Sequence, residues 1–279
     1  MLSEFRLTIL MENRVSKPNL IAEHGFSLHV ETPERILLFD TGRQHSFIHN
    51  ARILGLDLRK VNDIFISHGH TGHTGGMYYF LEEFERAHIV AHPTLFNKKY
   101  ILTNGSRLEI GVPYEQKELE ALGAKFTFST LPHFFSENIF STGEVPRVAD
   151  YEKIDEAYRV RVLESDLTDE LHDDMALVLK TEEGLVIMMG CAHSGTINTI
   201  RHAMRTAGIN EVYAVVGGMH LNHASAERIE KTTRALKEIN PRYIIPLHCT
   251  GFRAISYFFK IFPEKILLFN VGDVFALRK

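Results

Sequence analysis

Apolar residues recur along the chain in short runs with strand-like spacing, and these runs alternate with longer amphipathic stretches. The apolar runs 26–31 and 35–39, separated by a turn, predict one hairpin, and the runs 175–180 and 185–189 predict a second. We predict strands at 5–11, 26–31, 35–39, 61–66, 88–91, 175–180, 185–189, 212–216, 243–246, 266–269 and 274–277. We predict helices near 45–54, 74–87, 114–122, 196–207, 224–239 and 252–261. Both halves run from a hairpin into strand–loop–helix units, which favours one domain over residues 1–279, with two packed sheets and helices outside.

The stretch near residues 95–165 is less regular than the rest of the chain. We interpret it as an insertion in the domain that could cover the active site. Its aromatic side chains are best explained as core. They are Tyr114, Phe126, Phe128, Phe134, Phe135 and Phe140.

Composition limits the classes of partner. The 279 residues are 44% hydrophobic and 24% charged, which is ordinary for a soluble globular protein. The net charge of −4 and the lack of a Lys/Arg cluster argue against a nucleic-acid partner. No apolar run approaches the roughly 18 residues of a membrane helix, and the first residues lack a secretory pattern. We expect a cytoplasmic protein without a membrane partner, and the sequence leaves its oligomeric state open.

Three histidines lie within six positions of one another, directly after the apolar run Ile64-Phe65-Ile66. They are His68, His70 and His73 in the segment Ser-His-Gly-His-Thr-Gly-His-Thr-Gly-Gly. Neutral imidazole is the commonest metal ligand among side chains, and His68 and His70, two apart at a strand end, can face the same way. A single histidine here would suggest a polar loop, but three at this spacing predict half of a transition-metal site.

The other half of the site should come from distant strand ends. His193 stands in Gly-Cys-Ala-His-Ser-Gly, His220 in Gly-Gly-Met-His-Leu and His248 in Pro-Leu-His-Cys-Thr-Gly. Each follows an apolar strand-like run and adjoins small residues. Cys191 and Cys249 lie beside two of these histidines, and we expect no disulfide between them in a cytosolic chain.

These motifs resemble the metallo-β-lactamase fold superfamily, whose hallmark is His-x-His-x-Asp-His after a strand. The resemblance covers the whole chain and is greatest to the group that includes the dihydropterin–ribofuranosylaminobenzene phosphate synthases. The pieces that match this group are Glu12-Asn13, Glu23-His24-Gly25-Phe26-Ser27, Leu38-Phe39-Asp40-Thr41-Gly42, Thr142-Gly143-Glu144-Val145-Pro146-Arg147, Gly190-Cys191-Ala192-His193-Ser194-Gly195, Gly217-Gly218-Met219-His220-Leu221 and Pro246-Leu247-His248-Cys249-Thr250-Gly251. The fold implied is α/β (α+β), a four-layer αββα sandwich with metal ions in a cleft at one edge.

The chain departs from the family motif at Gly72, where the family has the metal-binding aspartate. Carried over by position, His68, His70 and His193 would hold one metal ion. His73 and His248 would be left for a second ion, helped by water, Cys191 or a bridging group. Imidazole with thiolate suits Zn²⁺. The resemblance therefore implies one strong zinc site and a second that is weak or empty.

Several further residues have two interpretations each. His220 is either a ligand or, as we favour, a residue that contacts the substrate. Cys191 is a soft ligand or a small buried residue, and Asp40 either supports a ligand imidazole or ends a strand. Other residues with a possible role at the site are His24, which could face the cleft or lie in a polar loop, Arg147, which could clamp an anion or form a surface ion pair, and His172, which could border the site.

The leading functional hypothesis is a zinc-dependent hydrolase of a small, anionic substrate that acts through a metal-bound water. One alternative, implied by the resemblance, is a transferase that joins a pterin to an aminobenzene ribose phosphate. Another, motivated by Gly72, is a catalytically weak protein that binds a metal or a ligand.

Overall fold

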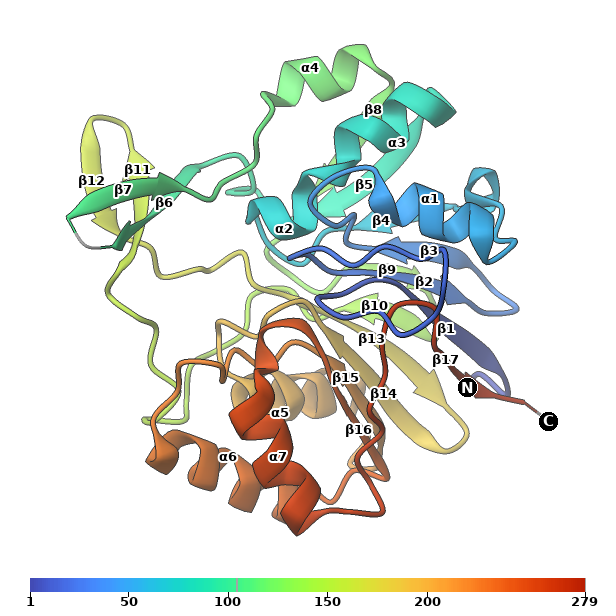
Figure 1. The fold of residues 1–279 in the computed structure, drawn as a ribbon, viewed down its shortest axis with the longest axis vertical. Helices are drawn as coiled ribbons and strands as arrows, with labels where there is room; N and C mark the ends of the chain where they lie inside the picture. Colours follow the sequence, from blue (N-terminus) through green and yellow to red (C-terminus); the bar gives the residue numbers. More distant parts are fainter. Residues whose placement is uncertain (104, 279) are drawn as a thin grey trace.

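The structure, a computed structural model, describes residues 1–103 and 105–278, and over these residues it forms an αββα sandwich (Figure 1). Two main sheets face each other, and helices cover the outer face of each one. This is the fold class that the sequence predicts, and the prediction is confirmed.

The first main sheet has the strand order β17-β1-β2-β3-β4-β5-β8. Its strands are β17 (Val274–Leu277), β1 (Phe5–Met11), β2 (Ser27–Glu31), β3 (Ile36–Phe39), β4 (Asp63–Phe65), β5 (Ala87–Ala91) and β8 (Ala124–Phe128). The second main sheet has the order β16-β15-β14-β13-β10-β9. Its strands are β16 (Tyr243–Pro246), β15 (Val212–Gly217), β14 (Gly184–Met189), β13 (Ala176–Thr181), β10 (Ile139–Ser141) and β9 (Phe134–Ser136).

The helices lie on the outer faces of these sheets or in the loops between strands (Figure 1). They are α1 (Ser46–Ile53), α2 (Thr71–Thr74), α3 (Gly76–Phe84), α4 (Gln116–Ala121), α5 (Thr196–Ala207), α6 (Ala226–Ile239) and α7 (Phe252–Ile261), with short 3₁₀ turns at Leu58–Lys60 and His248–Thr250. None of the described helices combines the length and the apolar character that a membrane crossing requires.

The core is layered because the central strands are covered on both sides. Every residue of β14 is buried, and its sequence Gly-Leu-Val-Ile-Met-Met is a nearly continuous apolar run, as expected for a strand between a helix layer and a facing sheet. Phe39 and Phe65 pack between the two sheets with Leu177 and Met188. Separate apolar clusters lie beneath the helices on each outer face.

A small third sheet projects from the sandwich at one end (Figure 1). Its order is β12-β11-β6-β7, and its strands are β12 (Ser165–Thr168), β11 (Tyr158–Val162), β6 (Lys98–Thr103) and β7 (Ser106–Glu109). It comes from within the stretch 95–165 and just beyond it. The same stretch also supplies β8, β9 and β10 to the main sheets, so it is not a single added unit.

Two predicted elements differ in detail from the structure. The helix predicted at 74–87 is found as the shorter α3, with α2 just before it; Gly75 between them has helical dihedral angles, but the N–H of Gly76 donates to the Gly42 carbonyl instead of within a continuous helix. The predicted strand at 266–269 makes only an isolated bridge, from Ile266 to Ile244. Its apolar residues pack onto the core without a ladder of hydrogen bonds.

Candidate metal centre and active site

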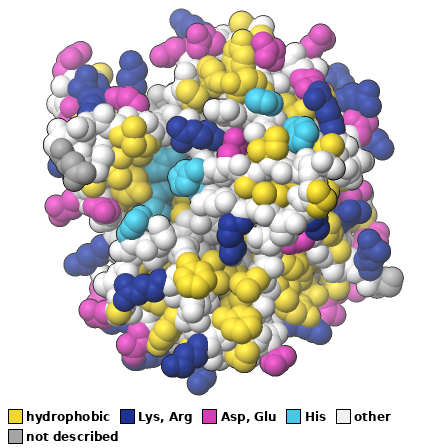
Figure 2. Space-filling view, in the orientation of Figure 1, with side chains coloured by type: hydrophobic (Ala, Val, Ile, Leu, Met, Phe, Trp, Pro, Cys, Tyr) yellow, Lys and Arg dark blue, Asp and Glu magenta, His cyan; other side chains and the backbone are white. Residues whose placement is uncertain are grey.

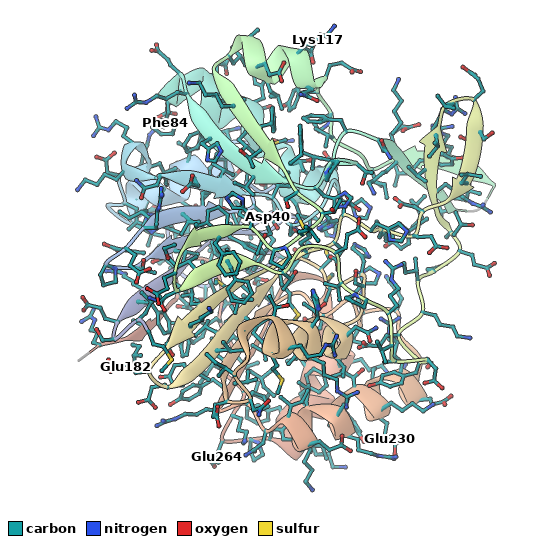
Figure 3. The ribbon with its side chains drawn as sticks, turned by 180° about the vertical axis from the view of Figure 1, so that it is seen from behind. Asp40, Phe84, Lys117, Glu182, Glu230 and Glu264 are labelled. Atoms are coloured by element: carbon teal, nitrogen blue, oxygen red, sulfur yellow. The ribbon has the colours of Figure 1, made fainter. Side chains whose placement is uncertain are left out.

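The candidate site lies at the sandwich edge where parallel strands end. β3 and β4 run parallel in one sheet, and β14, β15 and β16 run parallel in the other. Parallel strands bring their carboxyl ends to the same edge, which is where α/β folds place their ligands. The loops after these strands carry the histidines, so residues far apart in sequence meet there. Figure 3 shows Asp40, which follows β3, near the centre of the molecule between the two main sheets.

Several of these strand-end residues have a left-handed backbone, which non-glycine residues rarely adopt. The φ angles are 55° at Asp40, 56° at Ala192, and 48° at both His220 and His248. Such strain is typical of functional sites, where the surrounding structure enforces it. The sharp turn after each strand directs a polar side chain back toward the sandwich edge.

His68, His70 and His193 form the first group, which we call the imidazole cluster. Their ligand atoms lie within 4.8 Å of one another, and His68 Nε2 is 3.1 Å from His70 Nδ1. Two nitrogens bound to one tetrahedral zinc ion at 2.0–2.1 Å would lie about 3.3 Å apart. Nε2 of His193 and Nε2 of His70 are buried and have no hydrogen-bond partner. The residues present therefore fit a metal ion.

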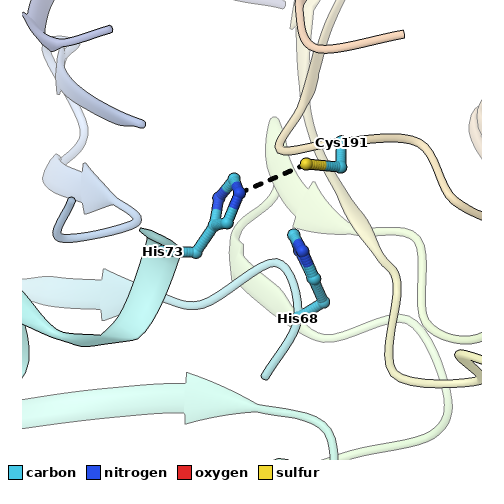
Figure 4. A group of neighbouring side chains, drawn as sticks. All are labelled: His68, His73 and Cys191. Atoms are coloured by element: carbon cyan, nitrogen blue, oxygen red, sulfur yellow. Dashed lines mark hydrogen bonds between the residues drawn. The ribbon is translucent and has the colours of Figure 1, made fainter. Parts of the chain in front are cut away.

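His73, Cys191, His248 and Cys249 form the second group, which we call the thiol cluster. Cys191 Sγ lies 3.2 Å from His73 Nε2, and Figure 4 shows the two side chains pointing toward each other, with His68 beside them. The ligand atoms of Cys191, His248 and Cys249 also lie within 4.8 Å of one another. Both cysteines are free thiols. Cys191 belongs to both groups in space, because its sulfur also lies within 4.8 Å of ligand atoms of His68 and His193.

Asp40 is buried and hydrogen-bonds to His73 of the thiol cluster and to Ser67, which contacts the imidazole cluster. Its Oδ2 accepts from Ser67 Oγ at 2.7 Å and pairs with His73 Nδ1 at 2.7 Å, and its Oδ1 accepts from Ser67 N at 2.8 Å. Ser67 Oγ in turn lies 2.9 Å from His68 Nδ1. A carboxylate accepting from Nδ1–H fixes the tautomer that leaves the Nε2 lone pair free for a metal ion. Asp40 therefore orients His73 directly and His68 through Ser67.

Burial keeps the imidazole rings neutral. Burial, followed by neighbouring imidazoles and Lys99, holds the pKa of His68, His70 and His193 well below the usual histidine value. Burial also lowers the pKa of His248 to about 3. Neutral imidazoles have the lone pairs that a metal ion needs.

The two thiols differ in their surroundings. Burial raises the pKa of Cys191. Burial would do the same for Cys249, but hydrogen bonds with Cys191 and His220 and the nearby His248 lower its pKa well below the ordinary thiol value. Of the two thiols, Cys249 therefore has the lower pKa.

Tyr158 brings the third sheet over the imidazole cluster. It begins β11, its ring stacks on His70 with centroids 5.6 Å apart, and its hydroxyl lies 3.3 Å from His220 Nε2. Burial raises the pKa of Tyr158, so the phenol keeps its proton. Tyr158 and His220 therefore place a proton donor beside the cluster.

A buried ion pair supports the turn between His68 and His70. Lys99 Nζ contacts Asp169 at 2.8 Å and Asp173 at 2.9 Å, and the other oxygen of Asp173 accepts from Gly69 N at 2.8 Å. Burial alone would lower the pKa of Lys99, but the two carboxylates raise it, so it remains a cation. A side chain at Gly69 would collide with the carbonyl of Leu95, so only glycine fits this turn.

The clusters open into a cavity of about 710 Å³. Figure 2 shows histidine side chains in a hollow on this face. The cavity lining includes Arg14, Arg43, Lys153 and Arg228, and among the described lining residues the acidic one is Asp155. A chain with net charge −4 therefore concentrates positive charge around this opening.

Comparison with known proteins places this site in a family. The model of the metallo-beta-lactamase superfamily matches residues 22–192, which is more than half of the chain. The chain belongs to the metallo-beta-lactamase superfamily. The superfamily is metal-dependent, and the two clusters supply candidate ligands, although they do not identify the metal.

Individual relatives cover nearly the whole chain. A 7,8-dihydropterin-6-methyl-4-(β-D-ribofuranosyl)-aminobenzene-5′-phosphate synthase of Methanocaldococcus jannaschii is 32% identical over 91% of this chain and 90% of its own length. A crystal structure described as a metal-dependent hydrolase of the beta-lactamase superfamily is 30% identical, with a TM-score of 0.85 over 97% of this chain and 98% of that one. A Zn²⁺-bound PqqB from Methylobacterium extorquens, 11% identical, has a TM-score of 0.57 over 97% of this chain and 99% of its own, which shows the shared fold alone.

The motif aspartate of the superfamily is absent here, and the space for it is narrow. Gly72 lines the cavity, and a Cβ at this position would lie 3.2 Å from the carbonyl oxygen of His24. The segment His24–Gly25 packs against Gly72, and Phe26 N donates to the Gly72 carbonyl at 3.0 Å. His24 itself lines the cavity, with its ring centroid 5.2 Å from that of His248.

The structure brings most of the predicted site residues together but leaves two outside. Those at the clusters or the cavity are His24, Asp40, His68, His70, His73, Cys191, His193, His220 and His248. Of the two interpretations of Arg147, the structure favours the ion pair: its guanidinium lies 3.7 Å from the Glu170 carboxylate, donates to the backbone carbonyls of Glu170 and Leu171, and does not line the cavity. His172 is also absent from the cavity lining and lies near Glu170 on the surface.

Sequence reasoning missed Tyr158, Lys99 and the place of Cys249 in the thiol cluster. Tyr158 and Lys99 lie in the irregular stretch, where no motif marks them. Cys249 could have been found from the sequence, because it lies directly after His248, a candidate ligand. The aromatic residues Phe126 and Phe128 stack on each other against the core rather than lining the cavity, in agreement with the favoured interpretation.

Proposed function

We propose that the protein is a metal-dependent hydrolase of a small, anionic substrate, with zinc as the metal. One observation supports this most directly: three neutral imidazoles have converging ligand atoms, and two of them, His70 and His193, line a cavity with a cationic lining. Three protein ligands and an open position are typical of catalytic rather than structural zinc sites. The similarity to a metal-dependent hydrolase over nearly the whole chain supports the same reaction class.

The chemistry needs little from the protein beyond positioning and proton transfer. A zinc ion at the imidazole cluster would supply an acidified water as nucleophile and polarise the bond under attack. Asp40 and the Asp173–Gly69 contact hold the ligands in place. Tyr158 and His220 are placed to hand a proton to the leaving group, and such proton transfer is worth typically 10²–10⁴ in rate.

The cationic side chains of the cavity lining indicate an anionic substrate. Arg43 and Lys153 reach the cavity from separate loops, and Arg14 and Arg228 add two more cations. Guanidinium groups suit phosphate and carboxylate, which they bind in a bidentate manner. The size of the cavity matches that of ordinary small-molecule sites. We therefore propose a small molecule with a phosphate or carboxylate group, and neither a nucleic acid nor a membrane as partner.

The test is a hydrolysis screen with zinc-loaded protein. Phosphate monoesters, phosphodiesters and anionic lactones would be offered to the loaded protein, to chelator-treated protein and to His193→Ala. We expect hydrolysis of at least one class, its loss after chelation and in His193→Ala, and its return when zinc is restored to the unmodified chain. Full activity without metal would overturn the proposal. A loaded protein that binds anions but hydrolyses none of the panel would favour a binding function.

A second candidate is a pterin-related synthase, and the 32% identity to the archaeal synthase favours it. In that case the metal would position and polarise a substrate rather than activate water. A dihydropterin should then bind tightly to the purified protein and protect Tyr158, the aromatic residue beside the imidazole cluster, from chemical modification. Absence of dihydropterin binding at millimolar concentration would remove this candidate.

A further inference from the structure

The thiol cluster is built like a metal site of its own. Its ligand atoms converge: Cys191, His248 and Cys249 lie within 4.8 Å of one another, and His73 Nε2 is 3.2 Å from Cys191 Sγ. A sulfur and a nitrogen bound to the same tetrahedral zinc ion would lie about 3.5 Å apart, given bond lengths of roughly 2.3 and 2.0 Å. The His73–Cys191 distance is close to that value, and the ligand atoms of Cys191, His248 and Cys249 form a converging group with the same sulfur.

Both imidazoles of this cluster are fixed in the orientation a ligand needs. His73 Nδ1 lies 2.7 Å from Asp40 Oδ2, and His248 Nδ1 lies 2.8 Å from Asn13 Oδ1. The amide of Asn13 is fixed in turn, because its Nδ2 faces the His248 carbonyl at 3.4 Å. Since each Nδ1–H donates to an oxygen, each Nε2 carries a lone pair.

No free carboxylate is available to the cluster among the described residues. Gly72 stands where the superfamily motif has its aspartate. Asp40 already accepts from Ser67 and His73, and Glu12 is occupied by Arg14 and by the backbone N–H of His248. The groups of converging ligand atoms in the described chain contain histidine and cysteine only.

The backbone also leaves room for the sulfurs. A Cβ at Gly218 would lie 2.7 Å from Cys249 Sγ and 3.1 Å from Cys191 Cα, so only glycine lets the two cysteine loops approach each other this closely. The left-handed backbone at His248 sets the direction of the loop that carries Cys249. Cysteines that served only as small packing residues would not need this arrangement.

We propose that Cys191 and Cys249, with His248 and His73, hold the second metal ion of this protein as a thiolate site in place of the missing carboxylate. Thiolate and imidazole select zinc, cadmium or copper(I) over magnesium and manganese. The inference rests on the proposed function only in assigning the first ion to the imidazole cluster. The site would be strong rather than vestigial, in contrast to the weak or empty second site expected from Gly72 alone.

The test uses cobalt as a spectroscopic probe. Metal-free protein, reduced and kept anaerobic, would be titrated with Co²⁺ while the near-ultraviolet absorption is followed. Sulfur-to-cobalt charge transfer reports thiolate ligation, and the chain has two cysteines, so such a band can arise only from Cys191 or Cys249. We expect the band to appear with the second equivalent, to vanish in Cys191→Ser and to weaken at least severalfold in Cys249→Ser.

Serine keeps the size of cysteine but removes the soft sulfur ligand. A lost band in either variant therefore reports the loss of a ligand rather than a change in packing. A second equivalent that binds without the band, or no second equivalent at all, would overturn the proposal. If Cys191→Ser does not fold, cadmium NMR of the unmodified protein decides the question, because a sulfur-bound cadmium resonates far downfield of one bound only by nitrogen and oxygen. A downfield signal supports the site, and a signal from nitrogen and oxygen ligation alone contradicts it.

Failure of this inference can be separated from failure of the proposed function. His68→Ala should remove the first equivalent and hydrolysis while the sulfur band persists. A sulfur band in a protein that hydrolyses nothing would leave the thiolate site standing and remove the hydrolase. Zinc-dependent hydrolysis without a sulfur band would support the hydrolase and remove the thiolate site.

Discussion

The imidazole cluster and the thiol cluster lie side by side at one sandwich edge, yet they are built differently. The first consists of three buried imidazoles beneath Tyr158 and rests on the Lys99–Asp173 pair. The second combines two imidazoles with two thiols beside the narrow gap at Gly72. Asp40 contacts both through His73 and Ser67. The comparison suggests that loss of one carboxylate changes the character of one metal position and leaves its neighbour intact.

The largest effect should come from emptying the imidazole cluster. In His193→Ala, we expect loss of the tightly bound metal ion and of hydrolysis, because two imidazoles cannot retain the ion that three hold. Elemental analysis and a hydrolysis assay measure both. His88→Ala is the matched control, since the partly exposed His88 pairs with Asp63 and does not line the cavity. Normal metal content in His193→Ala would show that His193 is not a ligand of the tightly bound ion and that the imidazole cluster is wrongly defined.

Tyr158 tests whether the third sheet takes part in the chemistry at the imidazole cluster. In Tyr158→Phe we expect kcat to fall about 10²-fold, in the range of a lost proton donor, with metal content unchanged. The shape of the pH–rate profile should not change, because burial raises the pKa of Tyr158 and the phenol keeps its proton over the assayed range. Tyr100→Phe is the control, because Tyr100 lies in the same small sheet and contacts Asp166 instead. Equal losses in both variants would mean that the sheet contributes only stability.

Asp40 should affect both clusters at once. In Asp40→Asn we expect metal affinity to fall 10–100-fold at each position, the usual cost of losing a carboxylate that orients a ligand imidazole. Calorimetric titration with zinc measures both events. Asp63→Asn is a close control, since Asp63 also pairs with a histidine Nδ1, that of His88, but away from the site. An effect confined to one position would show that Asp40 does not couple them.

Gly72 tests the difference in ligand chemistry directly. Gly72→Asp restores a hard oxygen, so manganese should bind the second position about tenfold more tightly relative to zinc. Gly72→Ala is the control, because it adds the same Cβ near the His24 carbonyl without a carboxylate. If both variants change the manganese-to-zinc preference equally, the shape of the loop rather than the oxygen is responsible.

The smallest effect concerns the pH dependence of the metal-free protein. Burial lowers the pKa of His248 to about 3. Below pH 6.5 the His248 side chain is therefore protonated in the unfolded chain but stays neutral in the folded chain. Stability is therefore lost as pH falls from 6.5 toward 3, by roughly 2 kcal/mol between pH 6.5 and 5. In His248→Gln the melting temperature should fall less over that range. His45→Gln, at an exposed histidine, should behave like the unmodified protein.

Much of the fold and part of the site could be predicted from the sequence. Apolar runs such as the one in β14 identify strands buried on both faces, and the strand ends at His68, His193 and His248 follow from them. The spacing of His68, His70 and His73 carries the metal motif on its own. These signals come from residues that are close together in the chain, so they can be recognised in a single sequence.

What the sequence could not supply depends on long-range packing. Tyr158 reaches His70 only because β11 pairs with β6 in a sheet that no periodicity marks. Arg147 has the chemistry of an anion clamp, yet its loop directs it toward the carbonyls of Glu170 and Leu171. Cys249 lies near Gly218 and Cys191, which follow other strands, so its place in the thiol cluster depends on long-range packing.

The most direct test of the account is the zinc content per chain after metal-free protein is incubated with zinc and dialysed, for the unmodified chain, His193→Ala and Cys191→Ser. The account predicts two zinc ions in the unmodified chain and one in each variant, with hydrolysis surviving only where the imidazole cluster is filled. No bound zinc in the unmodified chain, or two ions in His193→Ala, would contradict it.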